Sequence, residues 1–322
     1  MEITKNRQSE EVLRKMALRA FPGKQMEGAV ELTEGMCNTA YLVSFTDKSR
    51  YILKIAAAGN RGRMSNEANL MEAEVRAMQI VHKTGAVKAA KVLYYDTSNE
   101  ICDGHYFFME KLEGQSCSSV MDSFSDEEKA VIHFEIGQAE REITSILGVH
   151  FGLLGDDSHY FQDLFSFVYQ LISNVLSDAK RKQVDIVVSA EKILEMLKRD
   201  GAVFGQVTQP VLVHWDMWEG NIFVKEKHVS GIIDWERAMW GEALMDDRFR
   251  RHTRNADFLK GFGKETFTEA EMRRIYWYDI LLYLTMMTEG AYREYEDDGV
   301  YQWAKRMLEI SWKEIVGRGL SI

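Results

Sequence analysis

The first third of the chain carries one amphipathic segment followed by short apolar runs. Ser9 can cap a helix whose apolar face includes Leu13 and Met16, and Pro22 ends that helix. Short apolar runs bounded by turn residues predict strands at residues 29–33, 39–45, 51–56, 91–95 and 105–112. Between the third and fourth strands, residues 64–84 have helical spacing and stop at a glycine. Five strands with one helix inserted after the third predict a small α+β lobe.

Beyond Gly114 the spacing of apolar residues becomes mostly helical. Helix-length segments occupy residues 126–147, 161–182, 190–199, 269–288 and 300–316. One β-rich island, residues 211–235, interrupts them. We therefore predict a bilobal α+β fold. Residues 1–112 would form a small β-rich lobe with one helix, and residues 113–322 a larger, mostly helical lobe.

Composition and charge narrow the class of protein. The chain has 322 residues, of which 46% are hydrophobic and 28% charged, and this composition excludes a disordered chain. Its 40 Lys and Arg residues against 50 Asp and Glu residues give a net charge of −10. A chain this acidic is a poor candidate for binding nucleic acid and a better host for a cationic small molecule.

Cysteine usage and the apolar segments bear on the compartment. The widely spaced Cys37, Cys102 and Cys117 provide neither a disulfide framework nor a CxxC metal pair. The N-terminus has no apolar signal core, and the apolar stretch 275–288 is interrupted by Asp279 and too short to span a bilayer. We expect a reduced, cytoplasmic protein that does not bind membranes, and the sequence leaves its oligomeric state open.

The β-rich island holds the residues with the clearest chemistry. Asp216 follows an apolar strand, Asn221 lies at the edge of a predicted hairpin, and Asp234 ends the second hairpin strand. An aspartate that accepts a proton, with Asn and Asp oxygens to bind Mg²⁺, is what phosphoryl transfer requires. The alternative is a polar loop between two buried strands, which explains the alternation but leaves this combination of side chains as coincidence.

The string HWDMWEGN, followed by IIDWE, resembles the HxDxxxxN and IDxE motifs of the aminoglycoside phosphotransferase and choline kinase-like family. That family has a protein-kinase-like fold. The resemblance implies that Asp216 is the catalytic base, that His214 braces the catalytic loop, and that Asn221 and Asp234 bind Mg²⁺. The chain departs from the family pattern at two positions. Position 215 is Trp where a small residue is usual, and position 219 is Glu where Pro is common. Neither departure removes a group that the reaction requires.

The first lobe should supply a cation for the nucleotide phosphates. Lys54 lies inside the apolar run YILKIA, and a carboxylate on the following helix would hold it. Glu67, Glu72 and Glu74 are the candidates. We favour Glu74, because Met78 follows at helical spacing and because the choice matches the family's lysine–glutamate pair. The competing interpretations are a solubilising lysine on an edge strand and an ordinary exposed helix charge.

Three further segments resemble parts of the family. The turn EGMCNT resembles its nucleotide loop, with Gly35 and Asn38 matching, although any hairpin turn could look similar. The end of the fifth strand, Glu110 to Leu112, resembles the hinge, whose backbone would pair with adenine. Asp246 matches an aspartate that is mostly structural.

Taken together, these features predict an ATP- or GTP-dependent, Mg²⁺-dependent kinase that phosphorylates a hydroxyl of a small molecule. An aminoglycoside leads as acceptor, which would make the protein an antibiotic-resistance enzyme. A macrolide, a sugar or an amino alcohol stays open. The alternatives from other classes are a nucleotide-binding pseudoenzyme that acts through a partner, and a helical binding protein with an accidental motif. The sequence also leaves open whether the acceptor contacts Trp215 or the acidic segment from Glu289 to Asp298. For that segment, the pattern favours a solvated loop between two helices.

Overall fold

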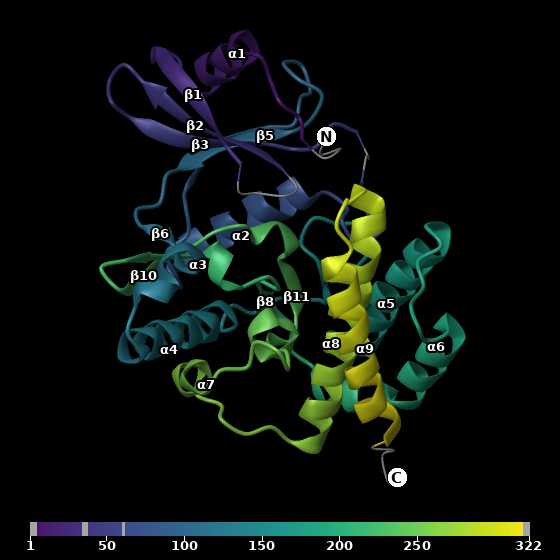
Figure 1. Ribbon diagram of the computed structural model, residues 1–322. Helices are drawn as coiled ribbons and strands as arrows, with labels where there is room; N and C mark the ends of the chain where they lie inside the picture. The colour runs from purple at the N-terminus through teal and green to yellow at the C-terminus, as the bar shows by residue number, and fades with distance from the viewer. Residues whose placement is uncertain (1–4, 34–37, 60–61, 318–322) are drawn as a thin grey trace.

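The computed structural model describes residues 5–33, 38–59 and 62–317, which form two lobes (Figure 1). The smaller lobe contains a five-stranded antiparallel sheet with strand order β1-β2-β3-β5-β4. Its strands are β1 (Met26–Leu32), β2 (Thr39–Phe45), β3 (Arg50–Ile55), β4 (Val92–Asp96) and β5 (Tyr106–Glu110). Helix α1 (Glu10–Ala20) precedes the sheet, and α2 (Leu70–Thr84) follows β3.

Strand alternation decides which side chains of β3 face the second lobe. Leu53 and Ile55 are fully buried in the cluster that the sheet shares with α1. Lys54 therefore lies on the opposite face, as does Phe107, its cross-strand partner in β5. Phe107 packs in the same core as Met78 of α2. The face that carries Lys54 is thus the face covered by α2.

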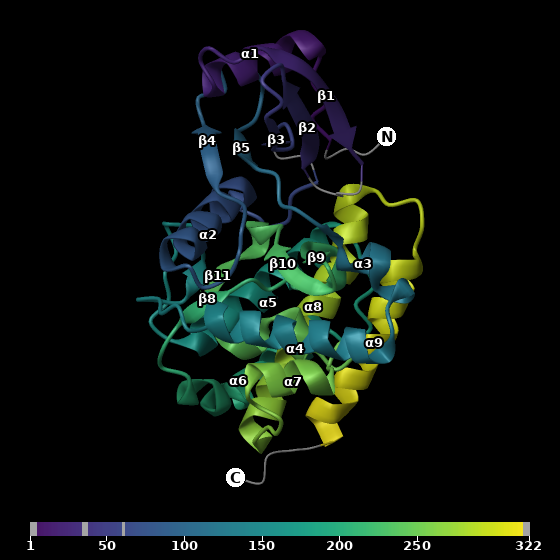
Figure 2. The ribbon, with the colours of Figure 1, turned by 90° about the vertical axis from the view of Figure 1, so that its left-hand side faces the viewer.

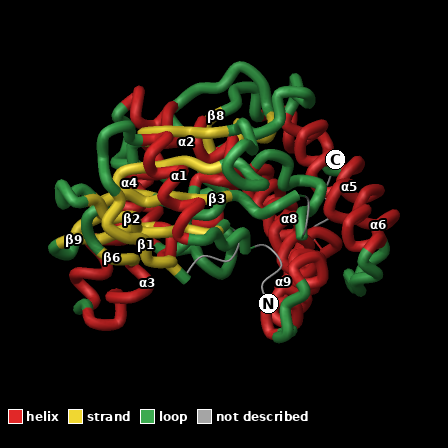
Figure 3. The backbone as a smooth tube through the Cα atoms, turned by 90° about the horizontal axis from the view of Figure 1, so that it is seen from above, coloured by secondary structure: helices red, strands yellow, loops and turns green. Residues whose placement is uncertain are grey.

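The larger lobe is mostly helical, and its helices are α3 (Cys117–Val120), α4 (Asp126–Ile143), α5 (Leu164–Arg181), α6 (Ala190–Arg199), α7 (Ala256–Phe262), α8 (Glu269–Arg293) and α9 (Gly299–Gly317). Seen from above, α5, α6, α8 and α9 form a group beside the sheet of the smaller lobe rather than beneath it (Figure 3). Turned to its side, the molecule shows α2 between that sheet and the helices of the larger lobe (Figure 2).

Two small sheets lie in the larger lobe. One has the order β10-β9-β6 and the other β7-β11-β8. Their strands are β6 (Gln115–Ser116), β7 (Gly152–Leu153), β8 (Val211–Val213), β9 (Ile222–Lys225), β10 (His228–Ile232) and β11 (Met239–Gly241). The predicted hairpin is confirmed as the β9–β10 pair. The segments that leave β8 and β10 carry the polar residues of the β-rich island.

The start of α2 differs from its prediction. The helix begins at Leu70, not at residue 64, because Asn69 adopts a left-handed conformation with φ of 52°. Upstream, the Glu67 carboxylate accepts a hydrogen bond of 2.9 Å from the backbone N–H of Met64, which folds the segment into a turn. Asn69 then donates to the backbone oxygen of Gly155 at 3.0 Å, so this turn is fixed to the larger lobe.

The end of α8 also differs from its prediction. The helix continues past residue 288 to Arg293, so Glu289 is helical and only the rest of the acidic segment forms the turn before α9. The bilobal α+β fold class is confirmed. The division after residue 112 stays a proposal; it falls between the end of β5 at Glu110 and the start of β6, which pairs with β9. Within the described residues, no helix is long and apolar enough to cross a membrane.

Candidate active site

Lys54 joins the two lobes through a pair of carboxylates. Its ammonium Nζ lies 2.6 Å from Glu74 Oε1 on α2 and 2.9 Å from Asp234 Oδ1 in the larger lobe. The structure thus pairs Lys54 with Glu74 among the candidate glutamates. Glu72 instead binds Arg76, and Glu67 binds arginines of the larger lobe. Although burial opposes the charged form, Asp234 and Glu74 raise the pKa of Lys54, so the ammonium stays protonated.

Asp234 is positioned by an irregular turn directly after β10. Its backbone is left-handed, with φ of 65°, and the short 3₁₀ helix η4 (Trp235–Arg237) follows it against α2. The preceding residue is held from two sides. Its N–H donates to the Asn221 backbone oxygen at 2.9 Å, and its carbonyl oxygen lies 3.0 Å from His214 Nε2. Despite burial, Lys54 keeps the pKa of Asp234 below its ordinary value.

His214 braces the loop that carries Asp216. Its Nε2 bonds the carbonyl of Ile233, and its Nδ1 accepts a hydrogen bond of 3.3 Å from the Asp216 backbone N–H. An Nδ1 that accepts requires the proton on Nε2, so the imidazole donates to the carbonyl. Burial lowers the pKa of His214 to about 4, which keeps this neutral tautomer at physiological pH. The position therefore suits a brace rather than a proton carrier.

Asp216 and Asn221 lie side by side. The Asn221 amide Nδ2 donates to the Asp216 backbone oxygen at 2.9 Å and to its carboxylate Oδ2 at 3.3 Å. One amide thus fixes both the backbone and the carboxylate of the aspartate. Burial raises the pKa of Asp216 to about 7, while the charge of Arg237 opposes that rise. A carboxylate with this pKa can take a proton from a hydroxyl near neutral pH.

A cluster of oxygen ligands surrounds Asp234. One carboxylate oxygen each from Glu74, Asp234 and Glu236 lies within 4.8 Å of the others. Glu74 Oε2 is buried and has no hydrogen-bond partner among the described residues. Burial and the charge of Asp234 raise the pKa of Glu236 to about 8. Burial also raises the pKa of Glu74 to about 7, against the charge of Lys54. These hard oxygen donors, one of them unpartnered, fit a divalent cation such as Mg²⁺.

Glu236 is the last residue of the IDxE string, yet the motif alone did not predict a role for it. Its Oε2 accepts a hydrogen bond of 2.8 Å from the Asn38 amide of the smaller lobe. Asn38 therefore reaches the carboxylate cluster from the predicted nucleotide loop. Gly35, the other predicted residue of that loop, lies outside the described residues. The signal for Glu236 was its place two residues after Asp234 in a short turn.

The predicted hinge follows β5 directly. Glu110 is exposed, and its N–H bonds the backbone oxygen of Lys91 at 3.0 Å, whereas Leu112 is buried. No side chain in this segment reaches the Lys54 pair in the described structure. The role expected of this segment, main-chain contact with a nucleotide base, stays a prediction.

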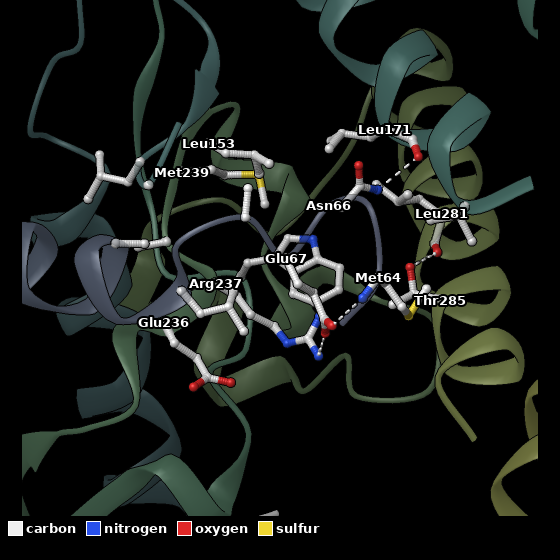
Figure 4. Close-up of a pocket in the computed structure, with 18 residues that line it drawn as sticks. Met64, Asn66, Glu67, Leu153, Leu171, Glu236, Arg237, Met239, Leu281 and Thr285 are labelled. Carbon is white, nitrogen blue, oxygen red and sulfur yellow. Dashed lines mark hydrogen bonds and ion pairs between the residues drawn. The ribbon is translucent and has the colours of Figure 1, made fainter. Parts of the chain in front are cut away.

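Next to the loop that carries Asp216 lies a pocket lined mainly by apolar side chains (Figure 4). Trp215, in a left-handed conformation with φ of 74°, lies on its wall with the Arg237 guanidinium 5.3 Å from its ring centre. Arg237 Nη2 also lies 3.0 Å from both Glu67 Oε1 and Glu289 Oε1. Arg293 binds the same two carboxylates, Glu67 at 2.7 Å. This network engages Glu289, the first residue of the predicted acidic segment.

The chain is similar in sequence to one protein family and in fold to many solved structures. A family model described as the phosphotransferase enzyme family matches residues 28–246. No curated protein sequence matches the chain. Many solved structures share its fold.

Three of these structures illustrate the similarity. A thermostable mutant of the aminoglycoside phosphotransferase APH(4)-Ia, in complex with ADP and hygromycin B, is 16% identical, with a TM-score of 0.67 over 96% of this chain and 99% of the other. A putative aminoglycoside phosphotransferase from Ralstonia eutropha JMP134 is 13% identical, with a TM-score of 0.66 over 95% and 98%. The streptomycin–ATP–APH(2")-IIa complex is 15% identical, with a TM-score of 0.59 over 97% of each chain.

At these identities the solved structures establish the fold alone. The family model is a stronger result, because it spans both lobes, from β1 through Lys54 and the loop that carries Asp216 to Asp246. The predicted resemblance and its protein-kinase-like fold are confirmed. The chain belongs to the phosphotransferase enzyme family.

Proposed function

We propose that the protein is a Mg²⁺-dependent kinase that transfers the γ-phosphate of ATP or GTP to a hydroxyl group of a small molecule. The observation that carries this proposal is the position of Lys54, held between Glu74 and Asp234, while the residue before Asp234 is hydrogen-bonded to the backbone of Asn221, the partner of Asp216. A fixed cation, a cluster of metal-binding oxygens and a nearby base are the parts that phosphoryl transfer needs.

In this proposal Asp216 acts on the acceptor. Asp216 is half-buried and Asn221 fixes the orientation of its carboxylate, so an incoming hydroxyl can hydrogen-bond to the remaining lone pairs. The carboxylate takes the hydroxyl proton as the oxygen attacks phosphorus. His214 takes no part in proton transfer; it keeps the loop in place through its two ring nitrogens.

Lys54 and the acidic cluster act on the nucleotide. Lys54 would exchange its contact with Asp234 for a phosphate oxygen and stay attached to α2 through Glu74. Asn221 and Asp234 would hold Mg²⁺, and Glu236 is close enough to Asp234 to serve as a further ligand. When bound, the cation supplies charge neutralisation on the phosphates in the transition state. The main chain from Glu110 to Leu112 would contact the base, and the nucleotide loop with Gly35 and Asn38 would cover the phosphates.

An aminoglycoside is the first acceptor class to test. Two structures of similar fold hold hygromycin B and streptomycin, and the net charge of −10 favours a cationic ligand. Against a direct role for the whole acidic segment, Glu289 is already paired with two arginines. Macrolides, sugars and amino alcohols therefore belong in the same panel.

The test is consumption of ATP and of GTP, with Mg²⁺, against that panel. The wild type is compared with Asp216→Asn, which keeps the shape of the side chain but cannot accept a proton. Asp257→Asn, at a partly exposed position on α7, is the matched control. We expect acceptor-dependent turnover in the wild type and the control, and its loss in Asp216→Asn with Mg-nucleotide binding retained.

Other outcomes distinguish the alternatives. Mg-nucleotide binding without turnover on any acceptor would favour a pseudoenzyme that acts through a partner. Failure to bind either nucleotide with Mg²⁺ would contradict the proposal altogether, as would equal turnover by Asp216→Asn and the wild type.

A further inference from the structure

A buried arginine holds the middle of the catalytic loop. Arg248 lies in the 3₁₀ helix η6 (Asp247–Phe249), and its side chain is 2% exposed. Its Nε donates to the backbone oxygen of Met217 at 2.5 Å, and its Nη1 lies 2.7 Å from Glu219 Oε1. One rigid guanidinium therefore binds the loop at two points, which a lysine ammonium could not do in the same geometry.

The two contact points lie between the proposed base and a proposed metal ligand. Met217 directly follows Asp216, and Glu219 opens the 3₁₀ helix η3 (Glu219–Asn221) that ends at Asn221. On its other side the loop is held by His214, which accepts from the Asp216 N–H. The peptide segment that spaces Asp216 from Asn221 is thus fixed by side chains from two directions.

Within the described part of the chain, several buried polar atoms around Arg248 lack hydrogen-bond partners, and this lowers the free energy of unfolding. Glu140 on α4 and Asp246 are both buried, and Glu140 Oε1 and Oε2, Asp246 Oδ2 and Arg248 Nη2 have no hydrogen-bond partner among the described residues. Burial and the charge of Asp246 raise the pKa of Glu140 well above its ordinary value. Buried charges that are incompletely paired destabilise a fold. The presence of the buried Arg248 charge in spite of this cost is explained if the geometry of the loop depends on that side chain.

We propose that Arg248 is a positioning residue for phosphoryl transfer, acting through the Met217 carbonyl and through Glu219 to set the spacing of Asp216 and Asn221. The inference rests on the proposed function. It assigns Glu219 a role as well, because that carboxylate gives the guanidinium its second anchor on the loop.

A second buried arginine in the same lobe provides a control that distinguishes an effect on loop position from an effect on stability. Arg274 on α8 has the same pattern of partners as Arg248. It donates to one backbone oxygen, that of Val203, at 2.8 Å, and binds one carboxylate, that of Glu242, at 2.7 Å. It is equally buried and contacts neither the catalytic loop nor the acidic cluster through these bonds. Arg274→Met should lower the thermal midpoint while leaving turnover per folded molecule unchanged.

The experiment measures Mg-ATP turnover, with the acceptor found in the panel or with water as acceptor. The variants are Arg248→Met, Arg248→Lys, Glu219→Ala and Glu219→Gln. We expect kcat to fall about 10- to 100-fold in Arg248→Met and Glu219→Ala, because small misplacements of reacting groups cost factors of this size. KM for Mg-ATP should change less than kcat, since Lys54 and Asp234 keep their contacts and Asn221 is the one proposed metal ligand that shifts. Arg248→Lys and Glu219→Gln should recover part of kcat.

Hydrogen exchange provides a second readout that needs no turnover. The amides of residues 216–221 should exchange faster in Glu219→Ala than in the wild type, and those of α8 should not. Glu219 is one-third exposed, so its variants should fold even if Arg248→Met does not. Wild-type kcat and wild-type loop exchange in Glu219→Ala would overturn the inference, as would losses that merely track those of Arg274→Met. A wild type that binds Mg-ATP but never turns it over contradicts the proposed function itself, and this inference falls with it.

Discussion

The Lys54 ammonium is paired with two carboxylates of the site, Glu74 and Asp234. It lies between two carboxylates in a largely buried position, where each charge-assisted hydrogen bond is stronger than a neutral one. The lysine is therefore held in one place before any nucleotide binds. Its pKa is raised above the ordinary value, so its charge does not vary over physiological pH.

Replacing Lys54 with Met should weaken Mg-ATP binding at least about tenfold, because a hydrogen bond to a charged group contributes about 1.5–3 kcal/mol. Titration with a fluorescent ATP analogue measures the change. Lys24→Met is the control: Lys24 lies in the same lobe and pairs with Asp47, far from the cluster in sequence and contacts. An affinity equal to that of the control would remove Lys54 from the phosphate site.

The stability of the metal-free protein should depend on Glu236. Because burial raises its pKa to about 8, the group favours the folded state below its unfolded pKa, and this contribution is lost as pH rises through about 8. Gln cannot ionise, and its carbonyl can still accept from Asn38. Glu236→Gln should therefore gain in thermal midpoint relative to the wild type between about pH 5 and pH 9. A difference that stays constant with pH would show that Glu236 does not titrate in this range.

Some of these residues could be predicted from sequence and others could not. His214, Asp216, Asn221 and Asp234 lie in one short stretch whose spacing resembles a known motif, and the structure brings them together. Arg248 reaches back to Met217 from outside that motif, two residues after Asp246, at a position that the family resemblance does not mark. Such a contact depends on how the polypeptide folds back on itself, and neither periodicity nor motif spacing records that.

Among the helices, α4 and α7 pack unusually closely, and Figure 2 shows them side by side. A Cβ atom added at Gly137 of α4 would lie 2.1 Å from the backbone oxygen of Phe258, and one at Gly261 of α7 would lie 2.0 Å from that of Phe134. Each glycine therefore makes room for the backbone of the opposing helix. This crossing fixes α4, the helix that carries Glu140.

Gly137→Ala should destabilise the protein by about 1–3 kcal/mol, because backbone atoms cannot give way as a flexible side chain could. In an exposed helix the same change would be stabilising, so the sign itself is diagnostic. Gly205→Ala is the control, since nothing lies within 4 Å of its added Cβ. Urea unfolding of both variants measures the difference. A loss no larger than that of Gly205→Ala would contradict the close approach.

The beginning of α2 shows why element boundaries were harder to predict than elements. Helical spacing continues upstream of Leu70, and no proline or glycine marks the true start. The helix does not extend upstream of Leu70, because Asn69 donates to the backbone oxygen of Gly155 and the Glu67 carboxylate accepts from the Met64 N–H. Both interactions belong to tertiary structure, so the local pattern could not contain them. The strands were predicted more closely, because their alternation already reflects burial on the sheet.

The two lobes are connected by more than the chain. Besides the Lys54–Asp234 pair, Asp178 of α5 accepts hydrogen bonds of 2.7 Å from both the N–H and the hydroxyl of Ser65. Arg76 of α2 binds Asp157 and donates to the backbone oxygen of Leu154 at 3.2 Å. Helix α2 is thus fixed to the larger lobe and carries Glu74 with it.

These contacts predict that the lobes unfold together. All seven tryptophans lie beyond residue 113, so their fluorescence reports on the larger lobe alone. Hydrogen exchange of the β3 amides reports on the smaller one. In urea both signals should change at the same midpoint. Loss of β3 protection well before the fluorescence change would mean that the smaller lobe unfolds separately.

The contact between Lys54 and Asp234 has a consequence for how the protein handles a nucleotide. The groups proposed to receive phosphate and metal are already satisfied by one another, and Asn38 likewise occupies Glu236. Under the proposed function, binding is then an exchange of partners rather than an addition. Part of the affinity is spent on breaking these contacts, and their re-formation helps to expel the spent nucleotide. Under the proposed function, these internal contacts would therefore lower the affinity for the nucleotide and speed its release.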